Sequence, residues 1–365
     1  MSGILNPDMS DAELNADDKD QAIDQILGTT MPAHGRLEVA LYEVLSASDW
    51  GFAQFIDIED VEQRAFASDL VLSAVEGVEV NVREMALCAI DYERLVGPNG
   101  RTMPAPDATL DELMDWKRIQ RTATDFARAF GSTTDCIAAV TIGVLGLPAS
   151  LHGASGKDLL TMPQLSAKVP ESQAAAADAA RDAFARRTAS PEGWLEWALE
   201  LRDAVVHRGH LTQTWITRPR RTRGKQIFVS TEQPIARLIR LEPHLRAQPW
   251  HPDILTLSTP DVSAGEAIWL AEPALHTMRE ITGRTIALVD ALCGVLFEAF
   301  TTDRTGWVLP EKQWYLERDL SKKRTQAAAS FRGFDPDYPV PPPDSMHVHP
   351  RSAQRLMLAE QLRTR

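Results

Sequence analysis

Residues 116–144 read WKRIQRTATDFARAFGSTTDCIAAVTIGV. Apolar side chains recur every three or four positions through this stretch, which keeps one face of a helix apolar over roughly eight turns. Gly146 and Pro148 follow directly, so we predict a long core helix that ends just before them. Its apolar positions are Trp116, Ile119, Ala123, Phe126, Phe130, Ile137, Val140 and Val144.

Four other segments have the same helical spacing. We predict helices over residues 37–48, 78–95, 191–209 and 264–300. Pro273 should begin or kink the last of them, because a proline lacks the amide hydrogen that a helix interior needs. The expected fold is therefore an all-α helical bundle.

One segment departs from the helical pattern. Residues 214–217 and 226–229 are β-branched or aromatic runs on either side of the basic stretch RPRRTRGK, residues 218–225. This arrangement predicts a β-hairpin with a basic tip. The hairpin would lie in an insertion, residues 210–260, between the last two core helices.

The composition changes at both ends of the chain. Residues 1–35 contain many aspartates, without the basic and apolar segments of a secretory signal, and we expect an acidic flexible tail. Residues 302–365 are polar and rich in proline, which predicts a second flexible tail. The helical domain would span residues 36–301, with its core in residues 78–300.

Charge and cysteine usage limit the function. The net charge of −13 in 365 residues argues against a protein that coats nucleic acid or anionic membranes along its whole surface, although a local basic patch remains compatible. The longest uncharged run, residues 136–156, is interrupted by glycine and proline, so we expect no membrane span. Cys88, Cys136 and Cys293 lie far apart in apolar helical patterns, which indicates reduced thiols and a cytoplasmic protein.

The strongest candidate for chemistry is LRDAVVHRG, residues 201–209, at the end of a predicted helix. A histidine such as His207 can transfer a proton to or from a ribose oxygen, while Arg202 can stabilise charge on a phosphorane. Asp203 could orient either side chain. Five residues of helix turn a side chain by about 140°, so Arg202 and His207 lie on adjoining faces and a dimer would be needed to complete a site.

This motif resembles the signature of the HEPN family (higher eukaryotes and prokaryotes nucleotide-binding domains). Arg202, Asp203 and His207 match its arginine, polar residue and histidine position for position. The resemblance implies a helical bundle that dimerises through the motif helix and, in many members, a metal-independent endoribonuclease in toxin, defence or stress systems. Other members are non-catalytic binding modules. The insertion at residues 210–260 departs from the pattern and puts the substrate in doubt.

Simpler interpretations remain open for the same residues. Asp203 and His207, four residues apart, could form an ion pair on their own helix, and Arg202 could pair with a carboxylate of another helix. His207 and His210 have a spacing compatible with metal ligands, but no third ligand lies nearby in the sequence, so we expect no metal and no cofactor. The basic hairpin tip could simply be solvated.

The leading hypothesis is a homodimeric, metal-independent endoribonuclease that leaves a 2′,3′-cyclic phosphate, with an antitoxin or regulatory protein as a further partner. The alternatives are a non-catalytic module that binds nucleotide, RNA or a protein, and a structural adaptor. Basic or histidine side chains near the motif and on the hairpin would follow the RNA backbone. They are Arg208, His210, Arg218, Arg220, Arg221, Arg223 and Lys225.

Overall fold

A computed structural model defines the helical part of the chain and four short strands. It describes residues 30–47, 61–96, 109–207, 217–222, 225–230, 254–256, 268–270 and 274–301. Within this part helices dominate, which confirms the prediction of a mainly α-helical protein. None of the described helices combines the length and hydropathy that a membrane span requires.

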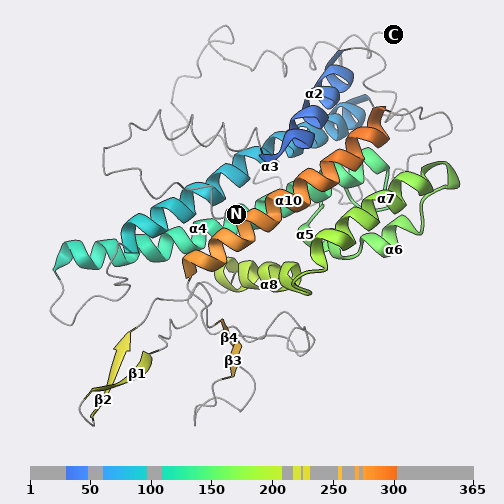
Figure 1. The fold of residues 1–365 in the computed structure, drawn as a ribbon. Coiled ribbons are helices and arrows are strands. Elements are labelled where there is room, and N and C mark those ends of the chain that lie inside the picture. Colours follow the sequence, from blue (N-terminus) through green and yellow to red (C-terminus); the bar gives the residue numbers. More distant parts are fainter. Residues whose placement is uncertain are drawn as a thin grey trace, which may run out of the picture.

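The centre of the fold is a bundle of long helices. Helices α3 (Val61–Val96) and α4 (Leu110–Leu145) run side by side, and α10 (Ala274–Thr301) packs against both (Figure 1). Helix α2 (Pro32–Ala47) lies on α3 and α10. The backbone amide of Ala33 donates to Asp290 Oδ1 at 2.8 Å, so a side chain of α10 satisfies a free amide at the beginning of α2.

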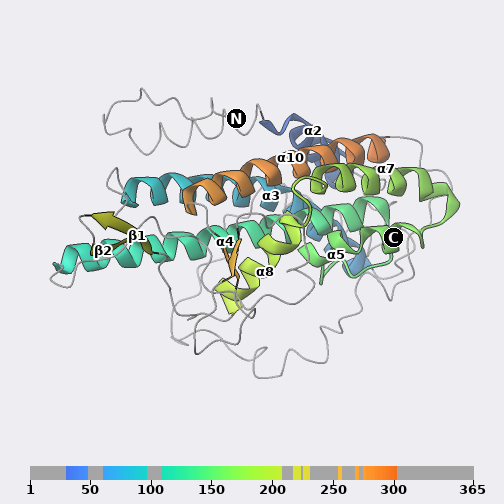
Figure 2. The ribbon, with the colours of Figure 1, turned by 60° about the horizontal axis from the view of Figure 1, so that its bottom comes forward.

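Four shorter helices add to the bundle within the described residues. They are α5 (Gly156–Leu160), α6 (Met162–Ser166), α7 (Glu171–Thr188) and α8 (Trp194–His207). Helix α7 packs against α10, whereas α8 packs against α4 (Figure 2). Trp194 and Trp197 of α8 are 1% and 2% exposed, as expected for core residues.

The two ends of α4 have clear local causes. At its beginning, Thr109 Oγ1 accepts from the Glu112 amide at 3.3 Å and Glu112 Oε2 accepts from the Thr109 amide at 2.8 Å, a reciprocal capping box. At its end, Gly146 has φ 61°, a left-handed conformation that favours glycine. The predicted end of this helix is confirmed, but α4 begins six residues before Trp116, the first apolar position of the sequence pattern.

Four strands form two small antiparallel pairs. Strand β1 (Thr217–Thr222) pairs with β2 (Lys225–Ser230), and β3 (Ile254–Thr256) pairs with β4 (Ile268–Leu270). Most of the insertion at residues 210–260 lies outside the described residues, and the side chains of the strands are not described. The hairpin with a basic tip therefore stays a prediction.

Three predicted boundaries are wrong. The last long helix does not begin at residue 264, because residues 268–270 form β4. It begins at Ala274, directly after Pro273, which is one of the two outcomes expected for that proline. The tail predicted for residues 1–35 extends too far, since Met31 and His34 are 3% and 2% exposed. The core begins before residue 78, because α3 starts at residue 61 and buries apolar side chains one turn apart from residue 67 onward. Residues 1–29 and 302–365 lie outside the described part.

Candidate functional site

The candidate site lies where α8 crosses α4 on the lower side of the bundle in Figure 1. Ala198 and Leu201 bury their side chains at 1% and 2% exposure, which fixes the rotation of α8 about its axis. Arg202 and Asp203 follow directly and are partly exposed. The apolar face of α8 therefore places this polar pair at the edge of its contact with α4.

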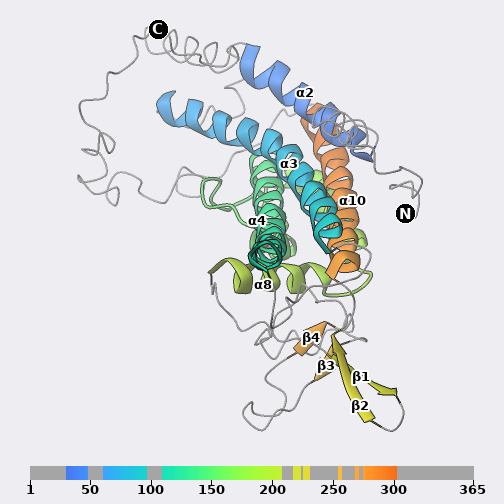
Figure 3. The same ribbon diagram turned by 90° about the vertical axis from the view of Figure 1, so that its left-hand side faces the viewer.

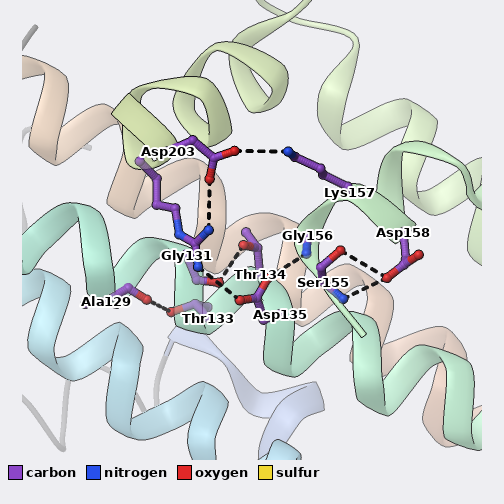
Figure 4. Close-up of polar contacts among 11 residues, drawn as sticks. Ala129, Gly131, Thr133, Thr134, Asp135, Ser155, Gly156, Lys157, Asp158 and Asp203 are labelled. Carbon is purple, nitrogen blue, oxygen red and sulfur yellow. Dashed lines mark hydrogen bonds and ion pairs between the residues drawn. The ribbon is translucent and has the colours of Figure 1, made fainter. Parts of the chain in front are cut away.

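Arg202 makes two ion pairs from the two ends of its guanidinium group, and Figure 4 labels the two partners, Asp135 and Asp203. Nη1 donates to Asp203 Oδ1 at 2.9 Å, and Nη2 donates to Asp135 Oδ2 on α4 at 3.4 Å. The Arg202 side chain is 26% exposed. This side chain thus links α8 to α4 while part of it stays accessible to solvent.

A glycine on α4 makes room for Arg202. A Cβ atom added at Gly131 would lie 2.4 Å from Arg202 Nε and 2.9 Å from its Cγ. Real carbon atoms do not approach so closely, so any larger residue at position 131 would displace the arginine. The close approach explains how the guanidinium reaches Asp135, one turn further along α4.

Asp203 is held between two cations. Lys157 Nζ of α5 lies 3.0 Å from Asp203 Oδ2, opposite the contact with Arg202 (Figure 4). Burial opposes ionisation of this carboxyl, but the hydrogen bonds from Arg202 and Lys157 outweigh it and lower the pKa of Asp203. Asp203 is therefore a carboxylate at neutral pH.

The pKa of Asp135 is shifted in the opposite direction from that of Asp203. Burial raises the pKa of Asp135, although a hydrogen bond from the Gly156 amide and the charge of Arg202 act in the other direction. The Gly156 amide donates to Asp135 Oδ1 at 2.7 Å, at the beginning of α5. Asp135 of α4 therefore contacts two other helices, α5 through Gly156 at 2.7 Å and α8 through Arg202 at 3.4 Å.

The structure brings together only part of the predicted site. Arg202 and Asp203 are in contact, and of the two side chains that Asp203 was expected to orient, Arg202 is the one whose position is described. His207 is the last residue of α8, and its side chain is not described. Of the predicted RNA-binding residues, Arg208, His210 and Arg223 lie outside the described residues. Arg218, Arg220, Arg221 and Lys225 lie on β1 and β2, where no side chain is described.

Sequence reasoning missed two members of this cluster, Asp135 and Lys157. In the simpler interpretation, Arg202 forms an ion pair with a carboxylate of another helix. Asp135 of α4 is such a carboxylate. A signal for it was present, since Asp135 is the one Asp, Glu, Lys or Arg between Arg128 and Lys157. A lone charge in an apolar stretch of helix needs a partner. Lys157 carries no comparable signal.

The described cysteines do not offer a nucleophile. Burial raises the pKa of Cys88 to about 12 and that of Cys136 to about 11, so both thiols stay protonated at neutral pH. All three cysteines are free thiols, as predicted. The chemistry of the described cluster is therefore that of two carboxylates, a guanidinium and an ammonium group.

Comparison with models of protein families, with curated proteins and with solved structures found no match. The resemblance to HEPN domains consequently rests on the sequence, chiefly on the motif in α8 and also on residues 126–139 of α4, which resemble the helix that packs beneath the motif helix.

Proposed function

We propose that this protein is a metal-independent endoribonuclease of the HEPN type, with its site at the end of α8. The observation that supports the proposal most directly is the pair Arg202 and Asp203. These side chains touch, remain partly exposed, and lie on the helix whose last residue is His207. A guanidinium and an imidazole on one helix end are suited to phosphodiester cleavage without a metal ion.

In the proposed reaction His207 removes the proton from a ribose 2′-hydroxyl. The 2′-oxygen then bonds to the neighbouring phosphorus, and the bond from phosphorus to the 5′-oxygen breaks. The leaving 5′-oxygen receives a proton from the His207 of a second copy, and the RNA is left with a 2′,3′-cyclic phosphate and a 5′-hydroxyl. Arg202 stabilises the negative charge on the phosphorane.

Arg202 can contact a phosphate without leaving Asp203. Its contact with Asp135 at 3.4 Å is longer than the 2.7–2.9 Å usual for charge-assisted hydrogen bonds. The contact with Asp203 at 2.9 Å is within that range. We therefore infer that a phosphate oxygen competes with Asp135 for the guanidinium, while Asp203 keeps Arg202 in position.

The proposal includes a homodimer, because one helix cannot complete the site. Arg202 and His207 are separated by about 140° around α8 and by roughly 7.5 Å along it. Two copies related by a two-fold axis would place both motifs around one groove. Basic side chains of residues 208–225 would then guide the RNA backbone toward it. We place this activity in the cytoplasm, with an antitoxin or another regulatory protein as the partner that restrains it.

The test is RNA cleavage by the full chain in the presence of a chelator. We expect cleaved ends with a 2′,3′-cyclic phosphate, and we expect Arg202→Ala to lose cleavage. Arg128→Ala is the matched control, because Arg128 is an exposed arginine of α4 that pairs with Asp125 at 2.9 Å. Intact RNA after prolonged incubation with the wild-type protein would overturn the proposal.

A second candidate, a non-catalytic helical module, is favoured by one specific observation. Arg202 already contacts two carboxylates, Asp135 and Asp203, which is the pattern of a structural ion-pair cluster. If that is its whole role, Arg202→Ala lowers the melting temperature and leaves binding of RNA, nucleotide or partner protein unchanged. If Arg202 binds phosphate, Arg202→Ala weakens RNA binding by a larger factor than the accompanying loss of folded protein can explain.

A further inference from the structure

His34, near the beginning of α2, is a buried histidine far from the motif helix. Its side chain is 2% exposed, and its Nε2 lies 2.9 Å from the backbone oxygen of Val75 on α3. Helices α2 and α8 lie on opposite sides of the bundle in Figures 1 and 3. His34 therefore belongs to a different part of the molecule from Arg202.

The contact with Val75 determines which nitrogen of His34 carries the proton. A carbonyl oxygen can only accept a hydrogen bond, so Nε2 must be the donor. In a neutral imidazole the lone pair is then on Nδ1. Histidines that bind metal ions usually donate their second nitrogen to a backbone carbonyl or a carboxylate in this way, which orients the ring.

Two glutamates complete a cluster around His34. Glu38 follows His34 by one turn of α2, and Glu79 follows Val75 by one turn of α3. One ligand atom from each of His34, Glu38 and Glu79 lies within 4.8 Å of those of the other two. Both glutamates are half-buried. The same helix contact that orients the imidazole thus brings two carboxylates beside it.

We propose that His34, Glu38 and Glu79 bind a Zn²⁺ ion that fastens α2 to α3. Imidazole nitrogen and carboxylate oxygen are both zinc ligands, with bonds of about 2.0–2.2 Å. Three protein ligands leave a fourth tetrahedral position for water. The ion would also add positive charge beside two partly buried carboxylates, one of which, Glu79, already has the Arg83 guanidinium at 3.7 Å.

The long glutamate side chains allow the cluster to close around the ion. Ligand atoms of a tetrahedral zinc site are separated by roughly 3.3 Å, as its bond lengths dictate. Glu79 also contacts Arg83 Nη2, but at 3.7 Å, which is too long for a hydrogen bond. Rotation of Glu79 toward His34 therefore breaks only a weak ion pair. Mg²⁺ is a poor alternative, because it prefers oxygen ligands in strict octahedral geometry.

The test is zinc binding to the full chain, measured by titration calorimetry after treatment with a chelator. Glu79→Gln and His34→Gln should each weaken binding by at least about tenfold. Glutamine at position 34 can still donate to Val75 through its amide, so the packing of α2 is kept while the Nδ1 ligand is removed. Glu43→Gln is the matched control, because Glu43 is an exposed carboxylate of the same helix.

Two further measurements distinguish the outcomes. At the same concentration, Zn²⁺ should raise the melting temperature of the wild-type chain by more than that of Glu79→Gln. Co²⁺ in place of Zn²⁺ should give a visible absorption spectrum typical of tetrahedral coordination, and excess Mg²⁺ should not remove it. Absence of zinc binding overturns the proposal. Equal binding by all variants would place the zinc elsewhere and overturns it as well.

Discussion

Replacing Gly131 should change the position of Arg202 more directly than any other single substitution on α4. A Cβ atom there would lie 2.4 Å from Arg202 Nε, so Gly131→Ala must displace the arginine or separate α8 from α4. We expect a loss of about 1–3 kcal/mol in the free energy of unfolding, as for other overpacked positions. Urea denaturation measures it.

The control for this substitution is Gly35→Ala on α2. A Cβ atom at Gly35 would have no neighbour within 4 Å. Alanine is favoured over glycine inside a helix by roughly 0.5–1 kcal/mol, so this variant should be slightly more stable than the wild type. Equal effects at positions 35 and 131 would show that Arg202 does not lie against α4.

Asp203 should make stability depend on pH in the acidic range. Its pKa is lower in the folded chain than in the unfolded chain, because Arg202 and Lys157 outweigh the effect of burial. The carboxylate therefore stabilises the folded state fully above the unfolded pKa of about 3.9, and this contribution disappears as the pH falls through the lower folded value.

The difference in unfolding free energy between wild type and Asp203→Asn should thus be largest near neutral pH and vanish in strong acid. Denaturation across the acidic range measures this difference. Asp182→Asn is the control, since Asp182 is 57% exposed and its pair with Arg181 is a surface contact. A difference that stays constant with pH would contradict the assignment of Asp203 as an ion-paired carboxylate.

Among the elements, the first turns of α4 should behave as a separately stabilised unit. Residues 109–115 are all exposed, and the capping box of Thr109 and Glu112 is the main described stabilising contact of this end. Thr109→Ala should cost about 1 kcal/mol locally. Because the segment buries little, it should fray without unfolding the bundle.

Hydrogen exchange would measure this local effect. Amides of residues 110–115 should exchange faster in Thr109→Ala, while those of the buried part of α4, residues 126–145, should be unchanged. A matching fall in the melting temperature of the whole protein would mean that the cap supports the core.

The elements that sequence reasoning predicts well are those with a continuous apolar face and a clear stop. The end of α4 at Leu145 follows from Gly146, and the beginning of α10 follows from Pro273. The first half of α3 was missed although Val71, Val75 and Val78 are buried there at helical spacing, so an apolar pattern was present in the sequence.

The candidate site was predictable only where its residues are neighbours in sequence. The contact between Arg202 and Asp203 is local, so a motif can find it. The contact between Arg202 and Asp135 joins residues that are 67 positions apart and depends on how α8 crosses α4. No short pattern encodes that crossing. The cluster of His34, Glu38 and Glu79 was missed for the same reason, because it depends on the register between two helices.

For the whole molecule, an acidic chain that binds RNA must do so through a local basic surface. With a net charge of −13, RNA binding would depend on the arginines at positions 218, 220, 221 and 223. Binding affinity should then fall with salt concentration. Each of these arginines that contacts a phosphate should add about 0.7 to the slope of log affinity against log salt for single-stranded RNA.

Replacing these four arginines by alanine should therefore reduce the slope by up to about 2.8, and fluorescence anisotropy of labelled RNA measures it. Arg121→Ala combined with Arg128→Ala is the control, because both arginines are exposed on α4 and pair with Asp125. If the variant with all four arginines replaced shows an unchanged salt dependence of affinity, the hairpin is not part of the RNA-binding surface.

The central claim is that His207, at the end of α8, takes part in RNA cleavage together with Arg202. The most direct test compares cleavage rates of labelled RNA in chelator for the wild type, His207→Ala and the control His276→Ala, an exposed histidine of α10. General acid–base catalysis typically contributes about 10²–10⁴-fold. We predict a rate loss of that size for His207→Ala and none for His276→Ala. Equal cleavage by all three proteins, or none by the wild type, would contradict the account.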